Sequence, residues 1–479
     1  MRTKHLLLLA ALGWSCTGDG TDGSDETDVV DTDSDTDTDT DSDSDSDSDT
    51  DSDTDTDSDT GGDCEPIVTF EDGKSPSNEI FVSPGGDDGG AGTRGEPLRT
   101  VGEAVRRASP GTAIRLLPAT WNERIWVSEA RGTAAAPLWI GGVPGEDPPV
   151  ITNASEGLHA SNVSYVIFHD LVVRGTRDNG INIDDGGSYD DPLATHHVIV
   201  RDVVIEQVGG SGNQDCLKLS GLDDFWILDS ALRQCGGGIS GSGIDMVGCH
   251  DGLIAGNVLA QTSGSGVQAK GGTTDVTIAW NDFDDFGQRG VNMGGSTGYE
   301  FFRPPLSTSS DNAEARRLRV HANRFRGGVA AFAFVGCDAC IASHNTILYP
   351  ESWVFRILQE TTSDETYTFV PAQDGFLVNN LVVARRSELS RWVNIGGGTD
   401  PDSFTVRGDL WWGGAGAETP TLPGDVSGLV VGQDPLVDED GIPGAGSPAI
   451  GGDPLTDGLR DRLGGCFEEP ITRGSVQVR

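Results

Sequence analysis

Short apolar runs recur along most of the chain, and in each of them a polar residue separates two apolar ones. Five such runs follow a glycine or a bend. They lie at residues 181–183, 217–219, 244–246, 267–269 and 291–293. Because successive side chains of a strand point to opposite faces, this alternation predicts short strands with one buried face. A further apolar run follows each of them, so the pattern predicts a repeated unit of short strands.

Many of the further apolar runs end in a polar residue, and these polar residues recur at a regular interval. They are Asp170, Asp202, Ser230, Asn257, Asn281, Asn323, Asn345, Asn380 and Asp409. The basal spacing is 22 to 28 residues, with occasional insertions, which suits one coil of a parallel β-helix with three strands and three bends. Asparagine at a repeated bend can adopt the left-handed conformation and bond to the next coil's asparagine. A β-propeller is the alternative, but each blade needs about 40 to 50 residues.

The repeat indicates a fold class through a resemblance. The chain is similar to right-handed parallel β-helix (pectate-lyase-like) surface lipoproteins over most of residues 80–450, with an asparagine ladder from Asn257 to Asn380. The resemblance implies an all-β, single-stranded solenoid. We expect this β-helix to span residues 63–479, with an N-terminal cap and an irregular C-terminal tail.

Both ends of the predicted solenoid carry matching segments. Residues 81–87 and 97–100, followed by a helix to about Ser109, resemble the N-terminal cap of pectate-lyase-like helices. Residues 110–116 then look like the first strand, and residues 446–450 resemble a common tail of the same proteins. A cap is needed because an open end of a solenoid exposes its core and unpaired strand edges.

The N-terminus reads as an export signal. Arg2 and Lys4 precede the apolar run 6–12, which is too short to span a bilayer, and Cys16 follows. This order resembles a bacterial lipoprotein signal, in which a cysteine is lipidated and becomes the mature N-terminus. We therefore expect a signal peptide at 1–16 and lipidation at Cys16, with plain secretion as the alternative.

An acidic segment separates the signal from the solenoid. The formal net charge of the chain is −44, and residues 17–60, almost pure Asp-Thr and Asp-Ser, contribute −20 of it. Such a segment lacks core-forming residues and repels itself, which predicts a disordered linker at 17–62. The arrangement is similar to surface lipoproteins of some Gram-negative bacteria, so the domain is expected at the outer membrane or cell surface, or secreted.

The charge also restricts the partners. With 32 Lys and Arg against 76 Asp and Glu, the chain lacks the basic clusters that bind nucleic acid or anionic lipid. Contact with a membrane is expected only through the N-terminal lipid anchor. We expect a monomer whose partner is a polysaccharide or a cell-surface glycan.

Seven cysteines follow Cys16, and export permits disulfides. The odd number leaves at least one unpaired. Cys337 and Cys340 have metal-ligand spacing, but no second pair completes a zinc site, which favours a bend disulfide or two core cysteines. Cys64 and Cys466 flank the domain and could tie its ends together, although sequence does not determine the pairing.

Two lysines stand out on the predicted strand faces. In register, one outward column contains Asn182, Lys218, Asp245, Gln268 and Asn292, and the next contains Ser220, Val247, Lys270 and Gly294. Neighbouring coils lie about 4.8 Å apart, so Lys218 and Asp245 are expected to touch. Lysine is more easily deprotonated than arginine, which makes both lysines candidate bases. The alternative is a solvated sheet face with ion pairs between coils.

Two insertions are expected to flank this face as the walls of a groove. The longer belongs to a 42-residue coil and carries aromatic and charged side chains, and the shorter spans 359–374. We expect Tyr299, Glu300 and Phe302, with Gln268 and Asn292, to bind substrate. The aromatic side chains would stack on sugar rings or, as an equally weighted alternative, seat the loop as a hydrophobic plug.

The coil at 266–271, with 280–283, resembles the base-lysine coil of alginate and chondroitin lyases. The resemblance implies β-elimination from a uronic acid, with Lys270 as the base and a cation, often calcium with an arginine, neutralising the carboxylate. Where that family has its arginine this chain has Gly294, so Arg289 or Arg303 would have to substitute. Lys218 paired with Asp245 is the other catalytic candidate, and no compact carboxylate motif identifies a metal site.

Two functions therefore stay open. The first is an exported, membrane-tethered polysaccharide lyase acting on a uronic-acid polymer, which the lysines and the insertions favour. The second is a non-catalytic, adhesin-like surface protein that binds glycans through the same face. The missing arginine and the acidic domain favour this second function.

Overall fold

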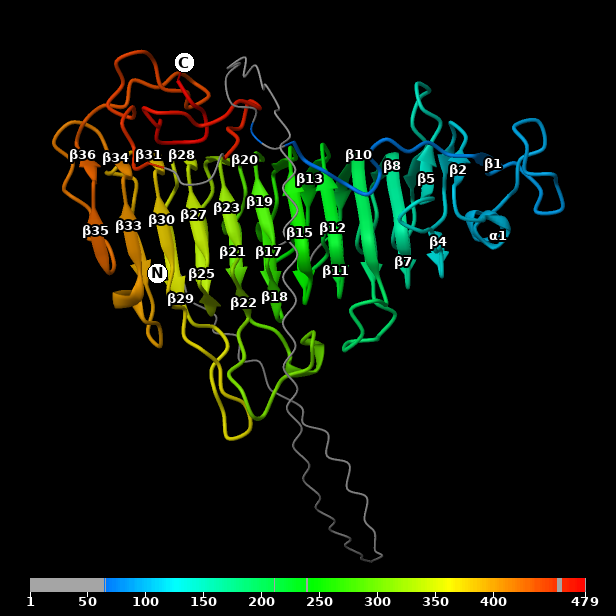
Figure 1. The fold of residues 1–479 in the computed structure, drawn as a ribbon, viewed down its shortest axis with the longest axis horizontal. Helices are drawn as coiled ribbons and strands as arrows, with labels where there is room; N and C mark the ends of the chain where they lie inside the picture. The colour runs from blue at the N-terminus through cyan, green and yellow to red at the C-terminus, as the bar shows by residue number, and fades with distance from the viewer. Residues whose placement is uncertain (1–63, 65, 211, 238–239, 455–458, 479) are drawn as a thin grey trace, which may run out of the picture. The chain divides into compact units, whose positions relative to one another are not determined.

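The computed structural model describes residue 64 and residues 66–210, 212–237, 240–454 and 459–478, which all belong to one unit, Thr60–Arg479. The expected signal peptide, Cys16 and the whole of the expected linker lie outside the described residues. The described chain winds into a right-handed parallel β-helix, whose successive coils stack side by side from β1 to β36 (Figure 1). Within the described residues, α1 is the single α-helix and is far too short to cross a membrane.

One face of the coils is a ten-stranded parallel sheet, on which the candidate site lies. Its strands are β4 (Ile125–Ser128), β7 (Leu158–Ser161), β9 (Ile181–Asp184), β11 (Leu217–Ser220), β14 (Ile244–Val247), β17 (Ser265–Lys270), β21 (Arg289–Gly294), β25 (Ala330–Val335), β29 (Trp353–Leu358) and β32 (Val393–Ile395). Each strand pairs in register with the strand of the next coil. We call this sheet the site sheet.

The other two faces form one larger sheet, because the long strands β8 (Ser164–Arg174) and β10 (His196–Val208) bend from one face into the other. The second face contains β1 (Asn78–Val82), β2 (Thr112–Leu116), β5 (Leu138–Gly142), β12 (Asp223–Leu228), β15 (His250–Ala255), β18 (Thr273–Thr274), β19 (Thr277–Ala279), β22 (Ala315–Arg316), β23 (Arg319–His321), β26 (Cys337–Asp338), β27 (Ile341–Ser343), β30 (Phe376–Val378), β33 (Thr405–Arg407) and β35 (Asp425–Ser427). The third contains β3 (Thr120–Trp121), β6 (Val150–Thr152), β13 (Ala231–Cys235), β16 (Val258–Ala260), β20 (Asp282–Asp284), β24 (Arg324–Arg326), β28 (Thr346–Leu348), β31 (Leu381–Val383), β34 (Leu410–Trp412) and β36 (Val430–Val431).

A continuous apolar core fills the space between the faces. Inward side chains of successive coils stack on one another, as Phe283 does on Phe325 with ring centroids 4.6 Å apart. The N-terminal end is covered by α1 (Val101–Arg107), which buries Val101 and Ala104. Its first turn is capped by the Thr100 side chain, which accepts a hydrogen bond from the Glu103 amide. The expected helix is therefore confirmed, and it ends two residues before Ser109.

The asparagine ladder from Asn257 to Asn380 is confirmed. The main-chain and side-chain amides of Asn281 both donate to Oδ1 of Asn323, and each of these two bonds is 3.0 Å long. The Asn281 side chain also donates to the Ile254 carbonyl. The same pattern repeats from coil to coil and ends on the carboxylate of Asp409, which accepts from Asn380. These bonds satisfy polar groups that are otherwise buried between two strands.

The expected left-handed conformation falls on different residues. It belongs to the residue before each ladder asparagine, such as Trp280 (φ 59°) and Ala322 (φ 50°), and not to the asparagine itself. Asp170 and Asp202 are left-handed themselves and therefore lie one position before the ladder column. The apolar residues that follow them occupy that column in their coils, so the polar ladder begins at Ser230. The alignment was wrong by one residue there, because both positions of this bend are polar in some coils.

Three disulfides join cysteines of the described chain. Cys64 pairs with Cys466 across a sequence separation of 402 residues and ties the two ends of the domain together. Cys216 pairs with Cys235, and Cys337 pairs with Cys340, which is the bend disulfide considered above. Cys249 is left unpaired and buried.

We predict that Asn323→Ala lowers the free energy of unfolding by about 2–4 kcal/mol, because two amides of Asn281 lose their acceptor and each buried unsatisfied group costs about 1–3 kcal/mol. Urea denaturation followed by circular dichroism measures the change. Asn78→Ala, at an exposed position of β1, is the control and should shift stability by less than about 0.5 kcal/mol. Equal effects of the two substitutions would contradict the role of the ladder.

A second prediction concerns the end of the ladder. Burial raises the pKa of Asp409 to about 7, against an ordinary value of 3.8. The folded protein therefore binds the proton more tightly, and stability falls as the pH rises from about 4 through 7. Asp409→Asn should remove this part of the pH dependence and be more stable than wild type at pH 8. A variant that is less stable at pH 8 in urea denaturation would show that the charge itself is needed.

Candidate active site

The outward column predicted from the sequence is present on the site sheet. Lys218 pairs in register with Asn182 on one side and with Asp245 on the other, and Gln268 and Asn292 continue the column. These side chains point outward because the apolar residues on either side of them, such as the two leucines that flank Lys218, point into the core.

Two lysines share one buried carboxylate at the centre of this column. Asp245 is 2% exposed. One of its oxygens accepts a hydrogen bond from Lys218, and the other lies 3.6 Å from Nζ of Lys270, which belongs to the neighbouring column. The predicted contact between Lys218 and Asp245 is therefore confirmed. A carboxylate this deeply buried needs opposite charge beside it, which the two ammonium groups supply.

The protonation of this cluster is set by burial and by the neighbouring charges. Burial alone would lower the pKa of Lys218, but the charges of Asp245 and Asp215 outweigh it and raise that pKa above its ordinary 10.5. Burial, together with the charge of Asp245, raises the pKa of Asp215 to about 7. Lys218 is consequently charged at neutral pH, and the charge of Asp215 changes near that pH.

The lysines line a cavity of about 540 Å³, large enough to hold sugar units. The strands of the site sheet contribute Asn182, Ser220 and the two lysines. The walls come from the loops 185–195 and 295–303, which leave the same edge of the coils (Figure 1). The longer insertion therefore does form a wall of a groove, as expected, and the loop after β9 forms the opposite wall.

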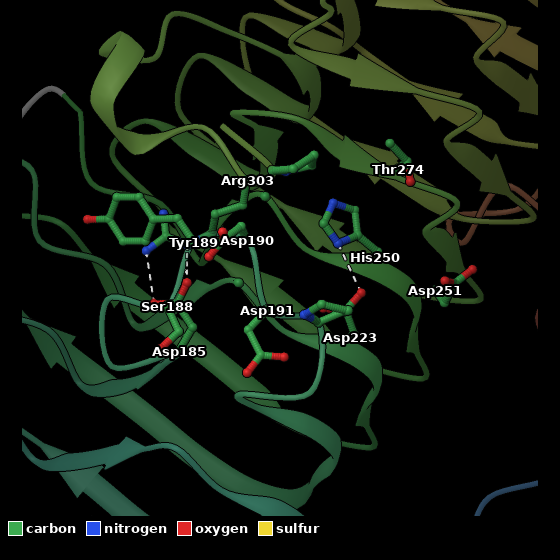
Figure 2. Close-up of a pocket in the computed structure, with 14 residues that line it drawn as sticks. Asp185, Ser188, Tyr189, Asp190, Asp191, Asp223, His250, Asp251, Thr274 and Arg303 are labelled. Carbon is green, nitrogen blue, oxygen red and sulfur yellow. Dashed lines mark hydrogen bonds and ion pairs between the residues drawn. The ribbon is translucent and has the colours of Figure 1, made fainter. Parts of the chain in front are cut away.

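Arg303 lines this cavity and also a second cavity of about 370 Å³, which Figure 2 shows. Its Nε lies 2.6 Å from Oδ2 of Asp185 and its Nη2 lies 3.2 Å from Oδ1, while the guanidinium covers the ring of Tyr189 at 4.0 Å. A β-carbon on Gly221 would approach the Asp185 carboxylate to 2.4 Å, and one on Gly248 would approach Arg303 Cβ to 2.3 Å, so both positions require glycine. The charge of Arg303 is thus neutralised by a dedicated partner.

The second cavity is acidic. Asp190, Asp191, Asp223 and Asp251 line it, and His250 lies 3.1 Å from the Asp223 carboxylate (Figure 2). Across the part of the chain that the structure describes, no group of three or more His, Cys, Asp or Glu side chains is arranged to hold a metal ion.

A second buried carboxylate holds the insertions in place. Glu314 is 1% exposed and accepts hydrogen bonds from the amides of Gly271 and Thr297 and from the hydroxyls of Thr297 and Thr361. These donors belong to the turn after β17, to the longer insertion and to the shorter insertion. One side chain therefore fixes both insertions against the coil that carries Lys270.

The other predicted site residues lie outside the lining of the lysine cavity. Arg289 pairs with Glu360 at 2.7 Å and donates to Asn292, so it is occupied by a partner of its own. Phe302 is 2% exposed and packs against Phe369, so the plug interpretation is correct for this ring and the stacking interpretation is wrong. The remaining predicted substrate-binding side chains do not line this cavity, namely Gln268, Asn292, Tyr299 and Glu300.

Phe301, 47% exposed, lines the cavity, whereas its neighbour Phe302 is buried. Sequence reasoning missed the residues at the end of β9 and in the loop after it. Asp184 ends β9, and Asp185 and Tyr189 belong to the loop after it, which was not treated as an insertion. The signal was present, because the interval from Asp170 to Asp202 is 32 residues and exceeds the basal period.

We predict that Asp245→Asn lowers the pKa of Lys218 below 10.5, because burial then acts with less opposing charge. Selective isotope labelling of lysine makes this measurable by NMR titration, since the sequence contains only four lysines. The exposed Asp284→Asn on β20 is the control and should leave the titration unchanged. If the pKa of Lys218 stays above 10.5 in Asp245→Asn, the charge of Asp215 alone is enough to keep that pKa raised.

Comparison with known proteins supports the fold at low sequence identity. No protein-family model matches the chain. The uncharacterised protein YwoF of Bacillus subtilis (strain 168) is 25% identical over 236 residues, which is 44% of this chain, and the match spans only about half (49%) of that relative. The pectate lyase Pel9A superposes with a TM-score of 0.54 at 13% identity, covering 85% of this chain and 98% of the lyase, and a glycoside hydrolase superposes with 0.47 at 10%, covering 74% and 96%. The chain has the right-handed parallel β-helix fold of pectate-lyase-like proteins.

Proposed function

We propose that the protein is an exported lyase that cleaves a uronic-acid polysaccharide by β-elimination in the lysine cavity. The observation that carries the proposal is the pair of lysines that share the buried Asp245 at the base of an open cavity. The shared fold with the pectate lyase Pel9A is consistent with this chemistry but does not establish it.

The two lysines suit different parts of the reaction. Lys218 is hydrogen-bonded to Asp245 and has a raised pKa, so it stays charged and can neutralise the uronate carboxylate as negative charge develops on it. Lys270 lies 3.6 Å from the same carboxylate, beyond hydrogen-bonding distance, so its nitrogen has no hydrogen bond to Asp245 that a proton transfer would have to break. We therefore assign Lys270 as the base and Lys218 as the electrostatic stabiliser.

The elimination balances with these groups alone. The amine of Lys270 takes the proton from C5 of the uronate, the C5–H electron pair forms a double bond between C4 and C5, and the C4–O bond to the next sugar breaks. The leaving oxygen receives a proton, which the newly formed Lys270 ammonium ion can return. Lys218 thereby takes the place of the arginine that the resembling lyases have where this chain has Gly294.

A non-catalytic glycan-binding protein is the second candidate, and the paired arginines favour it. Arg289 is paired with Glu360 and Arg303 with Asp185, one carboxylate for each guanidinium, so neither supplies the uncompensated positive charge of the arginine in the resembling lyases. In that case the lysine cavity would recognise an acidic sugar without cleaving it. Under either function we expect a monomer that acts outside the cytoplasm and is tethered, where Cys16 is lipidated, through its N-terminus.

Incubation with alginate, pectate and chondroitin, followed by the absorbance of the unsaturated uronate, tests the proposal. Lys270→Ala should lower kcat by about 10²–10⁴-fold, the usual contribution of a general base. Lys218→Met should lower kcat as well, whereas Lys74→Ala, outside the cavity, should not.

The outcomes separate the two functions. Absence of product from wild-type protein on the whole panel would overturn the lyase proposal for these substrates. Retention on immobilised polysaccharide without product would support the glycan-binding alternative instead.

A further inference from the structure

The outward column of the site sheet is covered on one side of the cavity and open on the other. Toward the C-terminal coils, Asn292 is 1% exposed and Ala333 is fully buried, so these two positions of the column offer no surface to a ligand. Toward the N-terminal coils, the column continues through the partly exposed Asn182 and His159 to Trp126 on β4. A polymer that occupies the cavity can therefore extend along the open side.

An exposed aromatic residue stands at the end of this open side. Trp126 is 44% exposed and points outward from a sheet face on which its neighbours in the adjacent coils are polar. Its ring lies 4.3 Å from the ring of His159, between centroids, and the guanidinium of Arg124 lies 4.9 Å from the indole centroid. The next outward column at this point consists of Ser128 and Ser161. Such an isolated ring among polar groups is unlike an apolar protein interface.

The imidazole ring of His159, beside Trp126 on the next coil, is held rigidly. Nδ1 of His159 lies 2.8 Å from Glu156 and Nε2 lies 2.7 Å from Asp184. Burial alone would lower the pKa of His159, but the two carboxylates outweigh it and raise the pKa to about 9. The imidazole is therefore charged at neutral pH and donates to both carboxylates, which fixes its plane. Asp184 also lines the lysine cavity, so the platform and the cavity are parts of one hydrogen-bonded surface.

We propose that Trp126, supported by His159 and Arg124, is an outer subsite on which a sugar ring of the bound polysaccharide stacks. This inference rests on the proposed function. β4 lies three strands from β11, or about 14 Å at about 4.8 Å per strand, so the subsite meets a sugar a few units away from the one at Lys218. The C–H groups on one face of a pyranose pack on the indole, while its hydroxyls bond to Arg124. The subsite therefore selects long chains over short ones.

The test compares long and short substrates in the full-length protein. The ligands are size-fractionated oligosaccharides of the polysaccharide that the wild-type protein cleaves or retains. Calorimetry measures their binding to two proteins, the Lys270→Ala variant and the double variant Lys270→Ala, Trp126→Ala. Trp126→Ala should weaken the binding of long oligosaccharides about tenfold and leave the shortest bound fragments unchanged. Trp353→Ala is the matched control, because Trp353 is on the covered side of the same sheet and also lies beside an arginine, with Arg356 4.5 Å from its ring centroid.

Each outcome has a separate meaning. If Trp126→Ala changes the affinity of neither the long nor the short fragments, the subsite is overturned while the proposed function stands. A loss for short fragments as well would show that Trp126 acts on the fold of the cavity, which also overturns the subsite, and circular dichroism would report it. If no polysaccharide of the panel binds to wild-type protein, the proposed function fails and this inference fails with it.

Discussion

The in-register stacking of coils is the constraint on which every other feature of this protein depends. Each strand takes its neighbours from the coils before and after it, about 4.8 Å away, so a side chain's position is set by its place in a column. Lys218 and Asp245 are 27 residues apart in sequence and touch because their strands pair residue for residue. The column brings the ammonium group of Lys218 and the carboxylate of Asp245 together, and no loop has to place them.

Stacking also explains why the buried polar groups are where they are. Along the bend between the second and third faces, asparagines satisfy one another from coil to coil and close on Asp409. At a different bend, where the insertions leave the coil, Glu314 accepts four hydrogen bonds and anchors both insertions. A repeat that can absorb long insertions at one edge while keeping its core register can build a site without disturbing its fold.

The sequence predicted the features that follow from the spacing of residues in the repeat. It did not predict the contacts that side chains of the irregular loops make. The coil repeat, the asparagine ladder and the contact of Lys218 with Asp245 all follow from the spacing of apolar and polar positions. The burial of Phe302 and the exposure of Phe301 do not, because neighbouring aromatic residues in a loop carry no period. The pairing of Arg303 with Asp185 joins residues 118 positions apart in two irregular loops, and no pattern within the strands encodes it.

The site has a charge opposite to that of its surroundings. Outside the signal and the acidic segment, the chain carries a net −26, which repels a polyanionic sugar. At the base of the cavity, two lysines face the single charge of Asp245, and Asp215 adds a second charge only as the pH rises through about 7. The lysine cavity thus offers an acidic sugar two cationic side chains on an otherwise acidic domain, which is the charge pattern that the proposed function needs.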